Sequence, residues 1–204
     1  MKKFARLPLA LLSMLIGVNA HAIPDLRNDF LPSFTGAHNA AFDIRDADVT
    51  FNTVSNQFTL HVTTDGPIAG APGVAYVFGF DVGGTLSSPF GTIGEPAVAF
   101  NKTVTLRSDG TGTVGSQGIG AQIDGADIFA LVSASLLPST LLAPENYRWS
   151  LWTIDSTVSG LARNADFAPD GDANVTVVPE PPNSVTMLTG LALLGFTARR
   201  RFRQ

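Results

Sequence analysis

The sequence contains no cysteine among its 204 residues and only three glutamates, and charged residues make up just 15% of it. A soluble domain usually carries about 25% charged residues, but the hydrophobic fraction of 45% is ordinary, so the chain is not expected to be disordered. The missing cysteines exclude a disulfide framework, thiolate zinc sites, iron–sulfur clusters and a cysteine nucleophile. The net charge of −4 excludes a strongly basic nucleic-acid binder, so we expect no nucleic-acid partner.

The first 22 residues have the pattern of a secretory signal peptide. Three basic residues within the first six positions precede an uncharged apolar run at positions 7–18. Ala20 and Ala22 are small residues where signal peptidase cuts, so the mature chain is expected to start at Ile23. The alternative, a permanent N-terminal anchor helix, is disfavoured because the apolar run is too short to span a bilayer. The secretion machinery and signal peptidase are therefore expected partners.

The last 27 residues, 178–204, form a second signal in three parts. A short motif comes first and consists of Val178, Pro179, Glu180 and Pro181. Eighteen uncharged residues, 181–198, would reach roughly 27 Å as a helix, a marginal span of the hydrocarbon core. The basic tail consists of Arg199, Arg200, Arg201 and Arg203. The positive-inside rule keeps such a tail in the cytoplasm, so we predict a single transmembrane helix with the body outside.

This tripartite end resembles the PEP-CTERM sorting signal of Gram-negative bacteria that produce exopolysaccharide. The resemblance implies that an exosortase, a membrane-embedded transpeptidase-like cysteine enzyme, recognises the segment and removes it near residues 178–181. It implies an inner-membrane-anchored precursor and then a location at the cell surface or in the extracellular matrix of a biofilm. The resemblance covers 27 of 204 residues and departs from the family at Pro182 and Asn183, where a small residue usually leads into the helix.

The physical properties of the motif agree with that implication. The prolines around Glu180 fix φ and remove N–H donors, which keeps the segment extended and accessible to an enzyme. Two other interpretations are open: a proline-rich linker before an ordinary anchor, and an amphipathic helix packed on the body.

Between the two signals, residues 23–177 show the alternation of half-buried β-strands. Val49 and Phe51 share one parity, and the apolar residues at 58, 60 and 62 share another, which predicts a hairpin around positions 55–56. Five apolar residues of one parity make 74–82 the strongest strand, with Gly79 on its opposite face indicating close packing or a bulge. Turn signals recur and no capped helical period is present. We predict an all-β body with eight to ten strands, a single antiparallel β-sandwich of jelly-roll or immunoglobulin-like type.

The body is acidic, because residues 23–180 contain seventeen acidic and six basic residues, a charge of −11. Acidic clusters occur at 43–48 and at 166–172. Asp166, Asp170 and Asp172 could form a Ca²⁺ loop, since hard cations prefer several oxygen ligands. The spacing does not match an EF-hand, and Asp and Gly are also the usual residues of solvated turns, which is the alternative. Ca²⁺ is the one cofactor considered; no other is expected.

Aromatic residues suggest a second type of site. In the predicted strand 147–154, Tyr147 and Trp149 lie on one face and Trp152 lies on the other. One tryptophan therefore points away from the core of a regular strand, and an exposed one could stack on a sugar ring, as in a lectin-like module. The alternative is that both faces are covered, by the second sheet and by a loop.

No catalytic motif stands out. There is no G-x-S-x-G elbow, and His38 and His61 are isolated and interpreted as incidental surface residues. We therefore expect no enzyme, but a structural or binding component of exopolysaccharide. The alternatives are a calcium-dependent or lectin-like carbohydrate-binding adhesion module, and a secreted hydrolase with two carboxyl groups roughly 5–10 Å apart.

Overall fold

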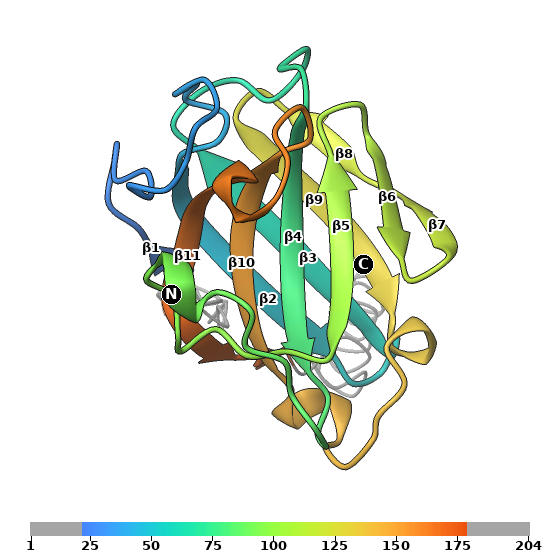
Figure 1. The fold of residues 1–204 in the computed structure, drawn as a ribbon. Helices are drawn as coiled ribbons and strands as arrows, with labels where there is room; N and C mark the ends of the chain where they lie inside the picture. Colours follow the sequence, from blue (N-terminus) through green and yellow to red (C-terminus); the bar gives the residue numbers. More distant parts are fainter. Residues whose placement is uncertain (1–21, 179–204) are drawn as a thin grey trace, which may run out of the picture.

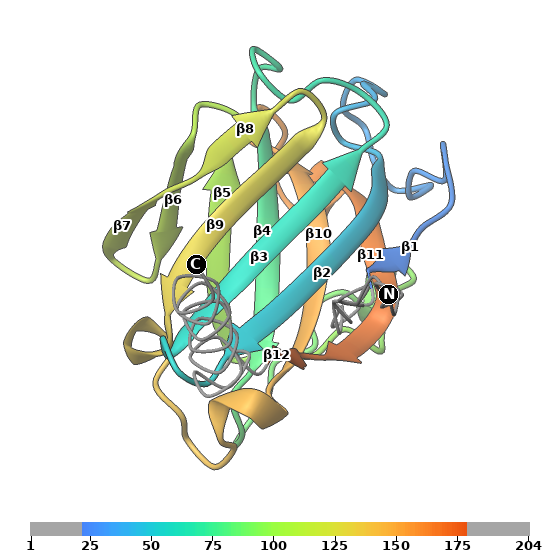
Figure 2. The ribbon, with the colours of Figure 1, turned by 180° about the vertical axis from the view of Figure 1, so that it is seen from behind.

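The computed structural model describes residues 22–178, which form two packed layers of β-strands (Figures 1 and 2). The predicted all-β body is confirmed. Within the described residues, no helix has both the length and the apolar composition needed to cross a membrane. The predictions for residues 1–21, which include Ala20, and for 179–204, which include most of the sorting motif and the arginine tail, lie outside the described residues.

Each sheet contains six strands. The first sheet has the spatial order β1 (Ile23–Pro24), β2 (Ile44–Asn52), β3 (Gln57–Thr64), β9 (Asp127–Ser133) and β8 (Gln122–Asp124), with β12 (Thr176–Val178) also beside β2. The second sheet has the order β11 (Asn164–Asn174), β10 (Arg148–Asp155), β4 (Val74–Asp81), β5 (Lys102–Arg107), β6 (Thr111–Val114) and β7 (Gln117–Gly120). Four single-turn 3₁₀ helices connect them: η1 (Gly91–Ile93), η2 (Ala134–Leu136), η3 (Pro144–Asn146) and η4 (Leu161–Arg163). Strands beyond the expected eight to ten are pieces of two to four residues, too short for an alternating pattern.

β2 and β3 form the predicted hairpin. Val49 pairs with Leu60 and Phe51 with Phe58, and all four side chains are buried. The turn places Asn56 at a φ of 54°, a left-handed conformation that asparagine tolerates better than most residues. Alternating burial along both strands sets the register, because a slip of one residue would expose the whole apolar face.

β4 is covered on both faces, as all eight of its residues are buried. Tyr76, Phe78 and Phe80 belong to the main core between the sheets, whereas Val77 belongs to a second cluster on the outer face. Gly79 lies on that outer face too. A Cβ there would lie 2.9 Å from ring atoms of Phe100 and of Trp152, so the predicted close packing is confirmed.

The outer cluster is small and separate from the main core. It consists of Val77, Phe90, Val98, Trp152 and Phe167. The segment 85–100, which contains η1, covers the second sheet here, while Trp149 from the same strand as Trp152 lies in the main core. The two tryptophans of β10 therefore occupy opposite faces of the sheet, as the alternation predicts.

The two ends of the described domain meet on one strand. β1 pairs antiparallel with β2 at Ala47 and Asp46, and β12 pairs parallel with β2 from Thr50 to Asn52 (Figure 2). The chain leaves β11 in the second sheet and crosses directly into β12 in the first. This crossing closes one side of the sandwich and brings β11 close to the N-terminal residues.

Candidate functional site

Residues 25–43, called here the N-terminal strap, connect β1 to β2 and run beside β11. The backbone N–H of Leu31 donates to Ala165 O (2.9 Å), and that of Thr35 donates to Ala162 O (3.1 Å). At the end of the strap, Thr153 Oγ1 donates to Phe42 O (2.7 Å). These bonds attach the strap to β11, η4 and β10 in turn.

The strap carries two aspartates to a third one on β11. Asp25, Asp29 and Asp166 each offer a carboxylate oxygen, and these three oxygens lie within 4.8 Å of one another. Asp166 is 3% exposed, and its two oxygens accept hydrogen bonds from the backbone N–H groups of Ile44 (2.7 Å) and Phe167 (2.8 Å). The oxygen Oδ2 of Asp25 is buried and has no hydrogen-bond partner. We call these three residues the aspartate cluster.

The cluster is electrostatically strained. Burial raises the pKa of Asp25 to about 7, and repulsion from Asp29, Asp170 and Asp43 adds to the rise against a backbone hydrogen bond that lowers it. Burial likewise raises the pKa of Asp166 to about 8 in spite of its hydrogen bonds from Ile44 and Phe167, and repulsion from Asp25 and Asp29 adds to the rise. Among the described residues no basic side chain forms an ion pair with the cluster; Arg27 pairs instead with Asp65 (3.2 Å).

A fourth carboxylate borders the cluster. Asp43 is 1% exposed, and its Oδ2 accepts a hydrogen bond from the N–H of Asn28 within the strap (2.8 Å). Its Oδ1 is buried without a partner, and its charge is repelled by Asp29. A buried carboxylate oxygen without a hydrogen-bond partner lowers the stability of the fold. A second one beside the cluster therefore indicates that this region lacks a compensating positive charge.

The chemistry of this arrangement suits a hard divalent cation. Calcium takes six to eight oxygen ligands at about 2.3–2.6 Å, so two oxygens on one ion can be separated by up to about 5 Å. Three carboxylate oxygens within 4.8 Å meet that condition. A bound Ca²⁺ would supply the missing charge and keep both Asp25 and Asp166 ionised at neutral pH.

The prediction that Asp166, Asp170 and Asp172 bind Ca²⁺ stays a prediction. These residues lie within β11, but the pairing with β10 shifts register between Ala168 and Ala173, so residues 169–172 bulge out of the regular ladder. Only Asp166 joins the cluster. Asp172 forms an ion pair with Arg148 (3.1 Å) and accepts a hydrogen bond from Ala99 N (3.3 Å), whereas Asp170 acts on Asp25 and Asp29 only through repulsion. Nothing in the sequence around Asp25 and Asp29 indicated a metal site, because only the fold brings these residues to β11.

Without calcium, stability is expected to fall as pH rises from about 4 to about 8. A carboxyl group whose pKa is raised by folding holds a proton that the unfolded chain has released, so each pH step in this window favours unfolding. Urea unfolding in chelator at pH 5.5, 7 and 8.5 measures the fall. The Asp25→Asn variant should show a smaller fall; an equal slope in both proteins would contradict the assignment.

The three residues considered for glycan stacking are largely buried. Tyr147 is 0% and Trp149 2% exposed, and both belong to the main core. Tyr147 donates its hydroxyl to Leu137 O (2.9 Å), and Trp149 Nε1 donates to Asn174 O (3.2 Å). Trp152 is 4% exposed and is covered by three phenylalanine rings. Both faces of β10 are thus covered, the alternative considered above.

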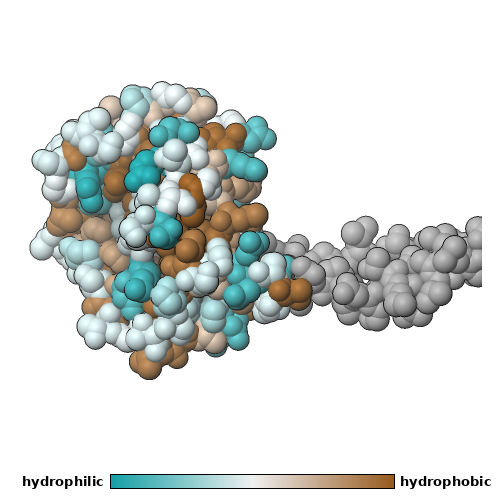
Figure 3. All heavy atoms as spheres, turned by 90° about the vertical axis from the view of Figure 1, so that its right-hand side faces the viewer, coloured by the Kyte–Doolittle hydropathy of each residue, from teal (hydrophilic) through white to brown (hydrophobic). Residues whose placement is uncertain are grey.

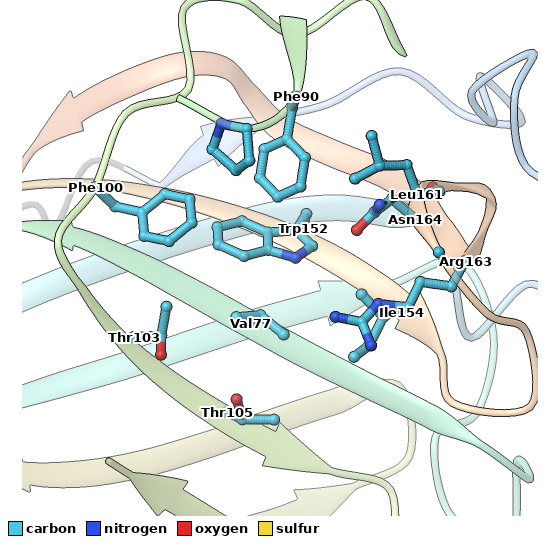
Figure 4. Close-up of a pocket in the computed structure, with 12 residues that line it drawn as sticks. Val77, Phe90, Phe100, Thr103, Thr105, Trp152, Ile154, Leu161, Arg163 and Asn164 are labelled. Atoms are coloured by element: carbon cyan, nitrogen blue, oxygen red, sulfur yellow. Dashed lines mark hydrogen bonds between the residues drawn. The ribbon is translucent and has the colours of Figure 1, made fainter. Parts of the chain in front are cut away.

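Trp152 nevertheless reaches a groove on the outer face of the second sheet (Figure 4). The groove has a volume of about 610 Å³. Phe90 and Phe100 line it on one side, η4 contributes Arg163 on another, and β5 contributes two threonines. None of the described residues that line it is acidic. The size is typical of ligand-binding pockets, which run from about 300 to 1,000 Å³.

Comparison of the chain with family models, with curated proteins and with solved structures finds no match. The function of the body must therefore be argued from the chemistry of these sites.

A second hollow lies between β9 and the β7–β8 connection. Figure 3 shows hydrophobic residues among polar ones on one side of the domain. Its volume is about 430 Å³, and Phe129 and Leu131 of β9 line it with 37% and 62% of their surfaces exposed. No charged residue is among its described lining residues. It offers apolar surface without the charged groups that would select a polar ligand.

His61 is not an incidental surface residue, contrary to the sequence interpretation. Its Nδ1 lies 2.9 Å from Asp48 Oδ1, its Nε2 lies 3.0 Å from Asp127 Oδ1, and its ring stacks on Phe129. Burial disfavours the imidazolium, but the two carboxylates outweigh it and raise the pKa of His61. The charged ring can donate from both nitrogens, so this residue joins three strands of the first sheet. The sequence placed it on the polar parity of β3 and gave no sign of its partners.

Proposed function

We propose that this chain is an exported β-sandwich protein, sorted to the cell surface or extracellular matrix as a structural or binding component of exopolysaccharide. The three-part segment at 178–204 supports the proposal, since it combines a Pro-Glu-Pro motif, an uncharged span and an arginine tail, the features expected of a sorting signal. β12 ends at Val178, the first residue of the motif, so the motif begins within the last strand of the folded body and no linker separates the two in the sequence.

The proposed sequence of events uses both termini. Signal peptidase cuts after Ala22, so the mature chain begins at Ile23, the first residue of β1. The uncharged span then holds the precursor in the inner membrane with its arginines in the cytoplasm. An exosortase-like enzyme cuts near residues 178–181 and releases the body. In this proposal the body has a jelly-roll or immunoglobulin-like topology and does not catalyse a reaction.

Mass spectrometry of the protein recovered from its host tests the sorting proposal. We expect a mature species that begins at Ile23 and ends near residues 178–181. The Glu180→Ala variant should keep its C-terminal segment and remain membrane-associated, because it loses the single charge between the prolines, whereas Glu145→Ala in η3 should be processed normally. A mature wild-type chain that still ends in Arg203-Gln204 would overturn the proposal.

A calcium-dependent binding module is the second candidate, and the aspartate cluster favours it. Three carboxylates within 4.8 Å, with one buried oxygen unpaired, fit a site that is complete only with a cation. Isothermal titration of Ca²⁺ into the purified chain should give one binding event per molecule, absent in Asp25→Asn. The hydrolase alternative is less well supported, because no carboxyl group lines the described part of the groove.

A further inference from the structure

We propose that the groove over β4, β5 and β10 binds a carboxylate-bearing sugar unit, a uronate, within an acidic polysaccharide. This inference rests on the proposed surface function and names the class of ligand that the body would hold. It assigns to Trp152 and Arg163 the roles of apolar floor and anion partner.

The floor and one wall of the groove are apolar. Val77 and the indole of Trp152 are 7% and 4% exposed and lie at the bottom, and the rings of Phe90 and Phe100 stand beside the indole (Figure 4). The ring centroids of Phe90 and Phe100 each lie 5.0 Å from that of Trp152. The half-buried ring of Phe100 is the one that can contact the C–H face of a pyranose, because Phe90, like Trp152, is almost fully buried.

Two of the polar groups that face the groove, the guanidinium of Arg163 and the indole N–H of Trp152, can only donate hydrogen bonds, whereas Asn164 and the two threonines can also accept them. Arg163 is exposed, and no described carboxylate lies within ion-pair distance of its guanidinium. The indole Nε1 of Trp152 has no acceptor among the described residues, although that of Trp149 has one. In Figure 4 this nitrogen is turned toward the side on which Arg163 lies. This nitrogen is not one of the buried polar atoms that lack a partner, so it is open to the groove and available to donate to a ligand.

Charge complementarity selects an anion. Residues 23–180 carry a charge of −11, which repels anions over most of the surface, but the described lining of the groove includes a cation and no acid. A guanidinium binds a carboxylate in a bidentate manner with two parallel hydrogen bonds. The half-buried Thr103 and Thr105 of β5 add hydroxyl groups along the opposite rim, which suits a ligand rich in hydroxyls.

The test is isothermal titration of the full chain with tri-galacturonate and with its methyl ester, a matched neutral sugar. We expect the acid to bind at least about tenfold more tightly than the ester, because a charge-assisted hydrogen bond is worth about that factor. Arg163→Gln should weaken binding of the acid about tenfold, and Arg45→Gln, which makes the same charge change on the other sheet, should not.

Trp152→Phe keeps the apolar floor and removes the Nε1 donor, so it should weaken binding several-fold. Thermal melting verifies that each variant is folded. If Trp152→Phe is not folded, the binding measured for Arg163→Gln, a change at an exposed residue, tests the proposal by itself. Equal binding of acid and ester, no binding of either, or binding of laurate in place of the sugar would overturn the assignment. Any of these results would leave C-terminal processing intact, so failure of the groove is distinguishable from failure of the sorting proposal.

Discussion

Calcium is expected to raise the melting temperature of this protein by about 5–10 °C. A ligand present at a hundred times its dissociation constant stabilises the folded state by about 2.7 kcal/mol if it binds only that state. For a domain of this size, about 1 kcal/mol shifts the midpoint by roughly 2–4 °C. The unfolded chain cannot reproduce the site, because Asp25 and Asp29 meet Asp166 only through the fold.

The Asp25→Asn variant separates this effect from a general influence of salt. It retains the size of the side chain but removes one charge from the strained cluster, so we expect it to melt at the same or a higher temperature in chelator. Its response to calcium should be lost. Asp124→Asn makes the same chemical change on the exposed edge strand β8, at the opposite end of the first sheet from β1, and should retain the full response. A calcium shift of equal size in all three proteins would refute the site.

Phe58→Ala is expected to lower the free energy of unfolding by about 3–5 kcal/mol, the usual cost of removing a buried phenylalanine. The ring is 0% exposed and joins both sheets, with centroids 4.8 Å from Phe51, 5.7 Å from Phe80 and 5.7 Å from Tyr147. Truncation leaves a cavity that three other rings cannot fill without leaving their own rotamers. Since natural domains are stable by only about 5–15 kcal/mol, this is a large fraction of the total.

Urea unfolding followed by tryptophan fluorescence measures this loss, because Trp149 lies in the same core. Leu131→Ala is the matched control: Leu131 lies on the neighbouring strand β9, pairs in register with Thr59 and is 62% exposed. Its truncation should change stability by no more than about 0.5 kcal/mol. Similar losses in the two variants would show that Phe58 does not hold the sheets together.

The local part of the fold could be predicted because alternation is a property of neighbouring residues. Phe51 and Phe58 alternate with polar residues on both strands of a short hairpin, and the five apolar residues of 74–82 mark one face of β4. The same logic placed Trp149 and Trp152 on opposite faces. It could not say what covers Trp152, because the covering rings Phe90 and Phe100 come from an irregular segment.

The candidate sites were harder to predict, since each depends on residues far apart in the sequence. Asp166 was expected beside Asp170 and Asp172, but these two follow the point at which β11 leaves its register with β10, and the fold brings Asp25 and Asp29 to Asp166 instead. His61 looked isolated because Asp48 and Asp127 come from the adjacent strands β2 and β9. The pattern of residues along the chain does not show which strands pair with one another.

The parallel pairing of β12 with β2 sets the order in which this protein can fold. Thr176 pairs with Thr50. The backbone N–H of Ile44 donates to Asp166, and the carbonyl of Phe42 accepts a hydrogen bond from Thr153. Contacts between such distant positions form slowly, because a long loop must close before they stabilise the chain. The first strands therefore have no complete set of partners until the last one has been synthesised. We therefore expect the sandwich to close only after β12 has been synthesised, which would suit the export proposed above.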